Sequence, residues 1–307
     1  DYSLTRNLRY SPEKFDLSRM RELMQEIGNP HLQYPVIHIA GTKGKGSTAA
    51  MIASVLQQAG YKVGFYISPH MVDFAERIQI NRVPISHADL VSMVNKLKPA
   101  VERIERLTTF ELTTAAAFCY FFQEKVDIAV IEVGLGGRLD ATNVVDPLLS
   151  VITSLSLDHV NVLGNTLDKI AFEKGGIIKP GKPVVVAPQK KEAIKVLEEI
   201  AEARGATLIQ IGKDYSYQMI DHDYDGQHFR VYVNENPHKG WTDIHLPLLG
   251  HHQMVNACTA FAALCEIEKM GWEIQPDAIQ NGFAKVEWEG RFEIISRDPY
   301  IVLDSAH

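Results

Sequence analysis

Residue types and spacing suited to phosphate chemistry occur in the run Gly41-Thr42-Lys43-Gly44-Lys45-Gly46-Ser47-Thr48. An apolar stretch at 36–40 precedes this run, and a helix with apolar periodicity is predicted from about 47 to 59. Glycines let backbone N–H groups turn toward an anion, and a helix start adds the positive end of its dipole. Lys45 could then reach β- and γ-phosphate oxygens while Ser47 or Thr48 offers a hydroxyl to Mg²⁺. The run predicts a nucleoside triphosphate loop.

The spacing of this loop differs from the usual G-x-x-x-x-G-K-[ST], which would place lysine at position 47. Position 47 is Ser47, and Gly46 separates it from Lys45. The alternative interpretation is a glycine-rich turn with an incidental lysine. The strand on one side and the helix on the other disfavour that alternative.

A second candidate is Glu132, which lies near the end of the apolar stretch 127–133. The carboxyl ends of buried parallel strands are where α/β sheets bind ligands, so Glu132 could join Ser47 in an oxygen shell for Mg²⁺. The alternative is a capping or salt-bridged glutamate. The glycine-rich run 134–138 follows at once and allows close backbone approach, which favours the ligand interpretation.

Five other positions carry weaker signals. His159, after the apolar stretch 150–154, is more typical of a hydrogen-bonded loop residue than of a Mg²⁺ ligand. Lys174 has the pattern of a surface lysine on a helix, and Arg291 is equally compatible with a surface charge. His251 and His252 are adjacent and do not share a helix face, which disfavours a zinc site.

The predicted elements alternate between strands and helices, and most strands are apolar on both faces. This pattern predicts an α/β fold, a mostly parallel sheet flanked by helices, with a small antiparallel β excursion at 215–246. The predicted strands are 36–40, 62–67, 127–133, 150–154, 183–187 and 207–211. The predicted helices are 16–28, 47–59, 87–106, 111–125, 190–204, 251–270 and 276–284.

Composition excludes several classes of protein. The 307 residues are 46% apolar and 22% charged, with a net charge of −7 and dispersed basic residues, which disfavours nucleic-acid binding. Three cysteines without paired spacing indicate buried free thiols in a reducing compartment. The sequence has no apolar run of transmembrane length and no signal-peptide pattern, so a cytoplasmic protein without membrane contact is expected. We also expect a monomer.

Several strings together resemble the folylpolyglutamate synthases and dihydrofolate synthases of the Mur ligase superfamily. The similarity covers essentially the whole chain, and the unusual loop spacing is that superfamily's own variant. The string from Glu132 to Asn143 is the most specific of them. The strings are Gly41–Ser47, Ser68-Pro69-His70, Glu132–Asn143 and Leu303-Asp304.

The resemblance implies a role for each matching residue. The triphosphate would be held by Gly44, Lys45, Gly46 and Ser47, and ATP would also be contacted by Asn256, Arg291 and Asp304. One Mg²⁺ would be bound by Ser47, Ser68 and Glu132, and His159 would help to hold a second. Lys174 matches a lysine that CO₂ carbamylates, so the catalytic residues would be Lys45, Lys174 and His159. The pterin-bearing substrate would be contacted by Asp16, Phe110, Arg138, Leu139 and Asp140.

The implied reaction is ATP-dependent amide formation. A folate or dihydropteroate carboxylate attacks the γ-phosphorus of MgATP, and the amino group of L-glutamate then displaces phosphate from the acyl phosphate. Residues 1–296 would form the ATP-binding domain, and 297–307 the start of a C-terminal glutamate-ligase domain that is otherwise absent, as in a truncated chain. The sequence leaves open which of the two acceptors is used.

Two alternatives to this activity remain at the level of sequence. One is a Mur-type ligase acting on a cell-wall precursor, which the string at 132–143 and Thr109-Phe110-Glu111 disfavour. The other is a nucleotide-binding fragment without activity of its own.

Overall fold

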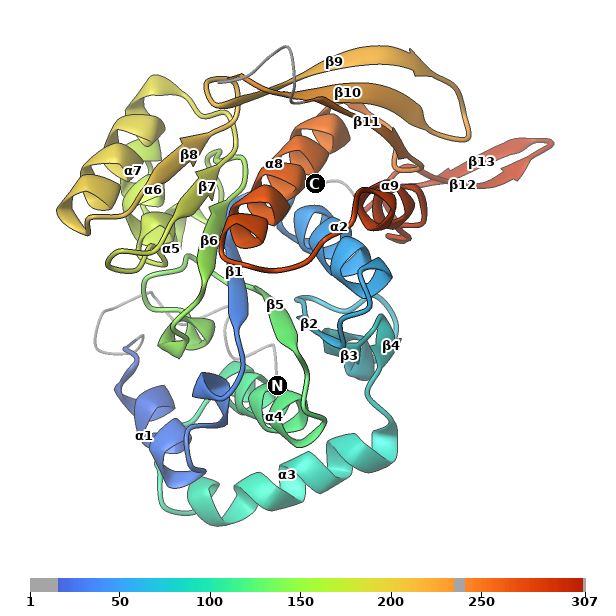
Figure 1. The fold of residues 1–307 in the computed structure, drawn as a ribbon. Coiled ribbons are helices and arrows are strands. Elements are labelled where there is room, and N and C mark those ends of the chain that lie inside the picture. The colour runs from blue at the N-terminus through green and yellow to red at the C-terminus, as the bar shows by residue number, and fades with distance from the viewer. Residues whose placement is uncertain (1–15, 235–240, 306–307) are drawn as a thin grey trace.

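The computed structural model describes residues 16–234 and 241–305. An eight-stranded sheet of order β4-β3-β2-β5-β1-β6-β7-β8 runs through the molecule (Figure 1). Six strands, from β2 to β8 in that order, are parallel, which confirms the predicted fold class. The antiparallel edge made by β3 and β4 lies outside the predicted strands. The strands are β1 (Val36–Ala40), β2 (Val63–Tyr66), β3 (Ile78–Ile80), β4 (Val83–Pro84), β5 (Ile128–Glu132), β6 (Leu149–Ile152), β7 (Val184–Val186) and β8 (Leu208–Gln210).

Helices cover both faces of this sheet, because successive side chains of a strand point to opposite sides. Ile37 and Ile39 of β1 pack in the core under α2, α8 and α9, whereas Val36 packs with α1, α3 and α4. Helices α6 and α7 cover the β6 and β7 end of that second face. The α-helices are α1 (Ser18–Glu26), α2 (Lys45–Gln58), α3 (His87–Val101), α4 (Thr109–Gln123), α5 (Val160–Leu163), α6 (Leu167–Gly175), α7 (Lys191–Ala203), α8 (His251–Lys269) and α9 (Pro276–Ala284). Short 3-10 turns are η2 (Pro30–Leu32), η3 (Phe74–Arg77) and η4 (Ala141–Val144).

One predicted helix is shorter in the structure, and one helix was not predicted. The helix expected at 87–106 ends at Val101, and Arg106 has a φ of 63°, which a right-handed helix cannot accommodate. The sequence interpretation also assigned no bounds to α6, which carries Lys174.

The antiparallel excursion predicted at 215–246 is confirmed as a three-stranded sheet. It consists of β9 (Tyr215–His222), β10 (Gln227–Val233) and β11 (Trp241–Leu246), and the chain turns at 223–226 between the first two strands. A separate two-stranded ribbon, β12 (Glu293–Arg297) and β13 (Tyr300–Leu303), extends from the body of the molecule (Figure 1).

The predicted domain boundary at 296/297 falls inside β12, and the division into two domains stays a prediction. Residues 1–15, 235–240 and 306–307 of those predicted domains lie outside the described residues. Cys119 and Cys258 are buried, Cys265 is half-buried, and all three are free thiols as expected. Across 16–234 and 241–305, none of the helices combines the length and apolar character needed to cross a membrane.

Candidate active site

The glycine-rich loop joins the end of β1 to the start of α2, as the sequence predicts. Gly44 has a φ of 85°, in the left-handed region that favours glycine, and α2 begins at the next residue. The N–H groups of Thr42 and Lys43 both donate to the carbonyl of Ser154, at 3.0 and 3.1 Å, which ties the loop to the end of β6. Asn256 of α8 fills the space beside Gly44, where a Cβ would collide with its amide. The structure therefore brings Asn256, a predicted ATP contact, to this loop.

Lys45 and Glu132 lie together at the carboxyl edge of the sheet. Strands β1 and β5 are neighbours, with Ile39 opposite Glu132, so the acid ends up beside the first turn of α2. Lys45 Nζ is 3.8 Å from Glu132 Oε1, and Glu132 is 5% exposed. Burial raises the pKa of Glu132, while the charges of Lys45 and Arg291 and the N–H of Ser68 oppose that rise.

The two serines predicted to bind Mg²⁺ with Glu132 lie on the segments that follow β1 and β2. Ser47 is buried on the first turn of α2, and Ser68 follows β2, with its N–H 3.4 Å from Glu132 Oε2. The Thr48 hydroxyl on the same turn is buried without a hydrogen-bond partner among the described residues. Among those residues no group of three or more His, Cys, Asp or Glu could hold a metal ion. One carboxylate with hydroxyls and phosphate oxygens is a donor set that suits Mg²⁺, which usually keeps several waters.

The interpretation of Lys174 as a surface lysine is wrong. Lys174 is 5% exposed, and its Nζ donates to the carbonyl of Gly41 at 2.8 Å. Burial, and next the charge of Lys45, lower the pKa of Lys174 to about 7. A signal was present in the sequence, because Lys174 lies four residues after the buried Ile170 and shares its helix face.

His159 lies at the same edge but remains open to solvent. It has a φ of 46° at the start of α5, its side chain is 59% exposed, and its Nε2 is 3.9 Å from Asp158 Oδ2. The charge of Asp158 reaches Lys174 and opposes the lowering of its pKa. Within the pair Asp158-His159, it is therefore Asp158 that acts on Lys174. The contact of His159 in the described residues is with Asp158.

Asp140 closes the glycine-rich loop that follows Glu132. Its Oδ2 accepts the N–H of Leu135 at 2.8 Å, and its Oδ1 accepts the N–H and the hydroxyl of Thr142 at 3.0 and 2.5 Å. The Thr142 hydroxyl also lies 2.8 Å from Nε2 of His38, a fully buried residue of β1. The Thr142 hydroxyl donates its hydrogen bond to Asp140. It can therefore only accept from His38, so Nε2 of His38 carries the hydrogen and donates to this hydroxyl. Burial lowers the pKa of His38 to about 3, in keeping with a neutral ring.

The sequence analysis did not single out His38 or Thr142. The available signal for His38 was a polar residue in the middle of an apolar strand. The chain His38–Thr142–Asp140 links the strand before the phosphate loop to the loop after Glu132.

The other residues predicted to contact a pterin lie on several segments of the chain. Arg138 donates to Glu173 at 2.7 Å and stacks over Phe172, whereas Leu139 is half-buried. Phe110 packs against the backbone of Gly134. Asp16 accepts the N–H of Ser18 at 2.7 Å at the start of α1.

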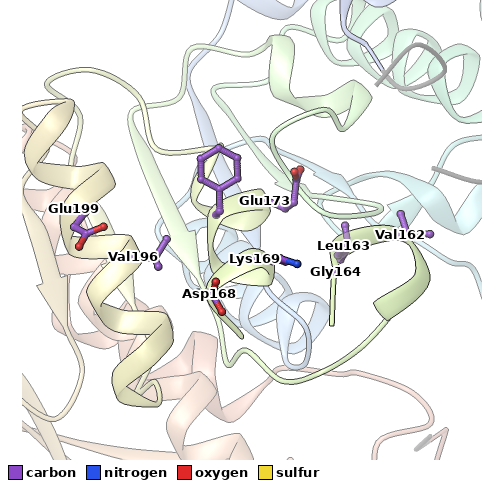
Figure 2. A pocket seen from close by; sticks show the side chains of 9 residues that line it. Val162, Leu163, Gly164, Asp168, Lys169, Glu173, Val196 and Glu199 are labelled. Carbon is purple, nitrogen blue, oxygen red and sulfur yellow. The ribbon is translucent and has the colours of Figure 1, made fainter. Parts of the chain in front are cut away.

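A cavity of about 480 Å³ is lined by residues of α5, α6 and α7 (Figure 2). Glu173, the partner of Arg138, is one of its lining residues, and Leu163 of its wall also packs on Gly136. The cavity is therefore separate from the phosphate loop but borders the loop after Glu132.

The remaining predicted ATP contacts lie near the end of the described chain. The Arg291 guanidinium donates to the carbonyl of Gly290 at 3.0 Å and to the Ser305 hydroxyl, and its charge acts on Glu132. Asp304 is exposed, and its charge raises the pKa of His252 at the start of α8, against the stronger effect of burial.

Comparison with known proteins finds one family match and several similar proteins. Residues 39–264 match the family described as "Mur ligase middle domain". The chain is 42% identical over 298 residues to the "Dihydrofolate synthase/folylpolyglutamate synthase" of Bacillus subtilis, covering 95% of this chain and 69% of that protein. It is 39% identical over 299 residues to the "Folylpolyglutamate synthase" of Lacticaseibacillus casei, with the same two coverages of 95% and 69%.

Solved structures give the same result. The structure described as "FPGS-AMPPCP complex" superposes with a TM-score of 0.90 at 39% identity, covering 95% of this chain and 73% of that one. The "FPGS-AMPPCP-folate complex" superposes with a TM-score of 0.91 at 37% identity, covering 100% and 76%.

Proposed function

The chain belongs to the folylpolyglutamate synthase and dihydrofolate synthase family of Mur ligases, and on this premise we propose that it binds MgATP at the loop 41–48 and phosphorylates a carboxylate of a folate-type substrate. The observation that carries the proposal is the 3.8 Å approach of Lys45 Nζ to Glu132 Oε1 at the carboxyl edge of the sheet. A cation for phosphate oxygens and an acid for the metal are thereby adjacent, as phosphoryl transfer requires.

The first chemical step joins the substrate carboxylate to the γ-phosphorus of ATP and releases ADP. The carboxylate is a poor electrophile, and the resulting acyl phosphate has phosphate as a good leaving group. The backbone N–H groups of the loop and the start of α2 bind the triphosphate, and Lys45 offsets charge on its oxygens. The amino group of L-glutamate then attacks the acyl carbon and displaces phosphate to form the amide.

Ser47, Ser68 and Glu132 would hold one Mg²⁺ through hard oxygen donors. The N–H of Ser68 lies 3.4 Å from Glu132 Oε2, and Ser47 follows Lys45 by two residues in the first turn of α2. The metal would neutralise charge on the phosphate oxygens. A second Mg²⁺ near His159 is part of the proposal. It is supported by Asp158, which precedes His159 and whose charge acts on Lys174 of α6.

We include carbamylation of Lys174 in this proposal. A carbamate forms when a neutral amine adds to the carbon of CO₂ and loses a proton, so a lysine must be deprotonated near neutral pH. The buried amine of Lys174, with a pKa of about 7 and a position beside Gly41, meets that condition. The carbamate would add oxygen atoms close to the loop that holds the phosphates.

The comparisons favour a folate-type acceptor over the cell-wall precursor that the sequence left open. A ligation assay with L-glutamate, ATP and Mg²⁺ tests this choice. Dihydropteroate and tetrahydrofolate are compared with a nucleotide-linked muramyl substrate. We expect phosphate release and amide product with at least one of the pterin substrates, and product with the muramyl substrate alone would overturn the assignment.

A further inference from the structure

Gly46 lies between Lys45 and Ser47, at the position that breaks the usual loop spacing. Its surroundings explain why this residue has no side chain. It lies in the first turn of α2, outside the left-handed region, so its backbone conformation does not call for glycine. What excludes a side chain is Trp288. A Cβ on Gly46 would lie 2.5 Å from Cζ2 and 3.3 Å from Cε2 of the Trp288 indole, with Glu132 Oε2 at 3.4 Å.

Trp288 reaches this place from the connection between α9 and β12, and other residues hold its ring. The fully buried Phe65 of β2 meets the indole edge-on, with ring centroids 6.0 Å apart. The guanidinium of Arg82, from the β3–β4 turn, lies 4.7 Å from the Phe65 centroid and 5.2 Å from that of Trp288. Arg82 Nη2 also donates to the carbonyl of Glu287 at 2.7 Å, next to Trp288 in the chain.

The indole nitrogen does not itself fix the ring. Trp288 Nε1 is buried without a hydrogen-bond partner among the described residues. Ring packing and the cation over the aromatic faces therefore set its position. Gly46 is thus enclosed between a held aromatic ring and the carboxylate of Glu132.

We propose that Trp288 is a positioning residue of the phosphate loop, which presses on Gly46 and sets the first turn of α2, with Arg82 holding the indole in place. The inference rests on the proposed function, because the residues on either side of Gly46 are the lysine and the serine assigned to phosphate and Mg²⁺. A shift of this turn moves both groups relative to Glu132, and errors of about 1 Å in such sites lower rates by about a hundredfold.

The proposal predicts that a steric defect at Gly46 can be corrected at Trp288. Binding of AMPPCP with Mg²⁺ is measured by calorimetry on the wild type, Gly46→Ala, Trp288→Leu and the double variant. Gly46→Ala forces overpacking against the indole, and we expect its affinity to fall by about tenfold or more. Trp288→Leu removes the ring atoms in conflict, so the double variant should bind at least about fivefold more tightly than Gly46→Ala.

Trp272→Leu supplies the matched control. Trp272 lies against Tyr61, with ring centroids 4.8 Å apart, and packs in the same core as Trp288. The double variant of Trp272→Leu with Gly46→Ala should bind AMPPCP no more tightly than Gly46→Ala alone. Equal recovery with Trp272→Leu, or no recovery with Trp288→Leu in a folded double variant, would overturn the proposal. Failure of the wild type to bind AMPPCP would instead contradict the proposed function.

A fluorescence measurement covers the case in which a double variant does not fold. With Trp241 and Trp272 replaced by phenylalanine, Trp288 is the remaining tryptophan of the three in the sequence. We expect AMPPCP with Mg²⁺ to change its emission, and Arg82→Leu to reduce that change because the ring is no longer held. Emission unaffected by a nucleotide that calorimetry shows to bind would contradict contact between the indole and the loop.

Discussion

The ammonium of Lys45 lies 3.8 Å from the carboxylate of Glu132, although 86 residues of chain separate the two positions. Adjacent parallel strands β1 and β5 produce this approach, since each ends at the same edge of the sheet. The separation of 3.8 Å is longer than a strong hydrogen bond, so the two groups attract each other mainly as charges. Four predictions follow from this edge of the sheet.

Removal of the Lys45 ammonium should abolish ATP turnover. Lys45→Ala takes away the cation that offsets charge on the phosphate oxygens, and we expect phosphate release to fall by at least about a hundredfold. Phosphate release with the pterin substrate, ATP and L-glutamate measures this. Lys195→Ala is the matched control, because Lys195 is 77% exposed and pairs with Glu199 on α7. Normal turnover in Lys45→Ala would refute the assigned role.

Replacing Glu132 by a neutral residue should leave the stability unchanged or higher but weaken the activity. Burial raises the pKa of this acid, so its charged form is costly to the folded state at neutral pH. Glu132→Gln removes that charge, and we expect an unchanged or higher Tm. The requirement for Mg²⁺ should rise by about tenfold or more, since a ligand is lost. Titration of phosphate release with Mg²⁺ checks this, and an unaltered Mg²⁺ dependence would show that Glu132 is not a ligand.

Lys174 should make stability depend on pH above neutrality. Its pKa falls from 10.5 to about 7 on folding, so between these values the unfolded chain binds more protons. The free energy of unfolding therefore rises with pH in this window, by at most about 1.4 kcal/mol per pH unit from this group. Below about pH 7 the amine is charged in both states and the burial cost is present in full.

Urea unfolding in CO₂-free buffer measures this effect. We expect Lys174→Met to flatten the rise between about pH 7.5 and 9.5. Identical slopes for the two proteins would mean that Lys174 is charged in the folded state. With isotope-labelled bicarbonate, a carbamate carbon signal present in the wild type and absent from Lys174→Met would support carbamylation.

Loss of the Thr142 hydroxyl should destabilise the protein more than loss of its methyl group. Thr142→Val leaves the buried Nε2 donor of His38 without an acceptor and removes one donor from Asp140, at a cost of about 1–3 kcal/mol. Thr142→Ser keeps the hydroxyl and loses a methyl group. We expect the valine variant to be the less stable of the two and to have the higher KM for the pterin substrate. Equal stability and equal KM for Thr142→Val and Thr142→Ser would contradict the role assigned to these hydrogen bonds.

The sequence was sufficient where local pattern and strand topology determine the outcome. The glycine run before α2 and the acid at the end of β5 were predicted to share one edge of the sheet, because the carboxyl ends of parallel strands lie at the same edge. The structure adds that β1 and β5 are neighbours. The alternating apolar pattern likewise identified the sheet formed by β9, β10 and β11.

Tertiary packing decided the rest. Lys174 carries a charge that ordinarily remains in solvent, and α6 alone does not show that this side faces Gly41. Trp288 and Arg82 meet over Gly46 from distant parts of the chain, and their contact depends on how α9 and the β3–β4 turn pack. The contacts of Trp288 and Arg82 leave no periodic trace in the sequence.

A crystal structure of this chain with Mg²⁺ and AMPPCP tests the central claim most directly. The account predicts that the β- and γ-phosphoryl groups lie on the backbone N–H groups of residues 44–47, with Mg²⁺ bonded to Glu132 and the Ser47 hydroxyl. A nucleotide bound elsewhere, or phosphates on this loop with the metal away from Glu132, would contradict it.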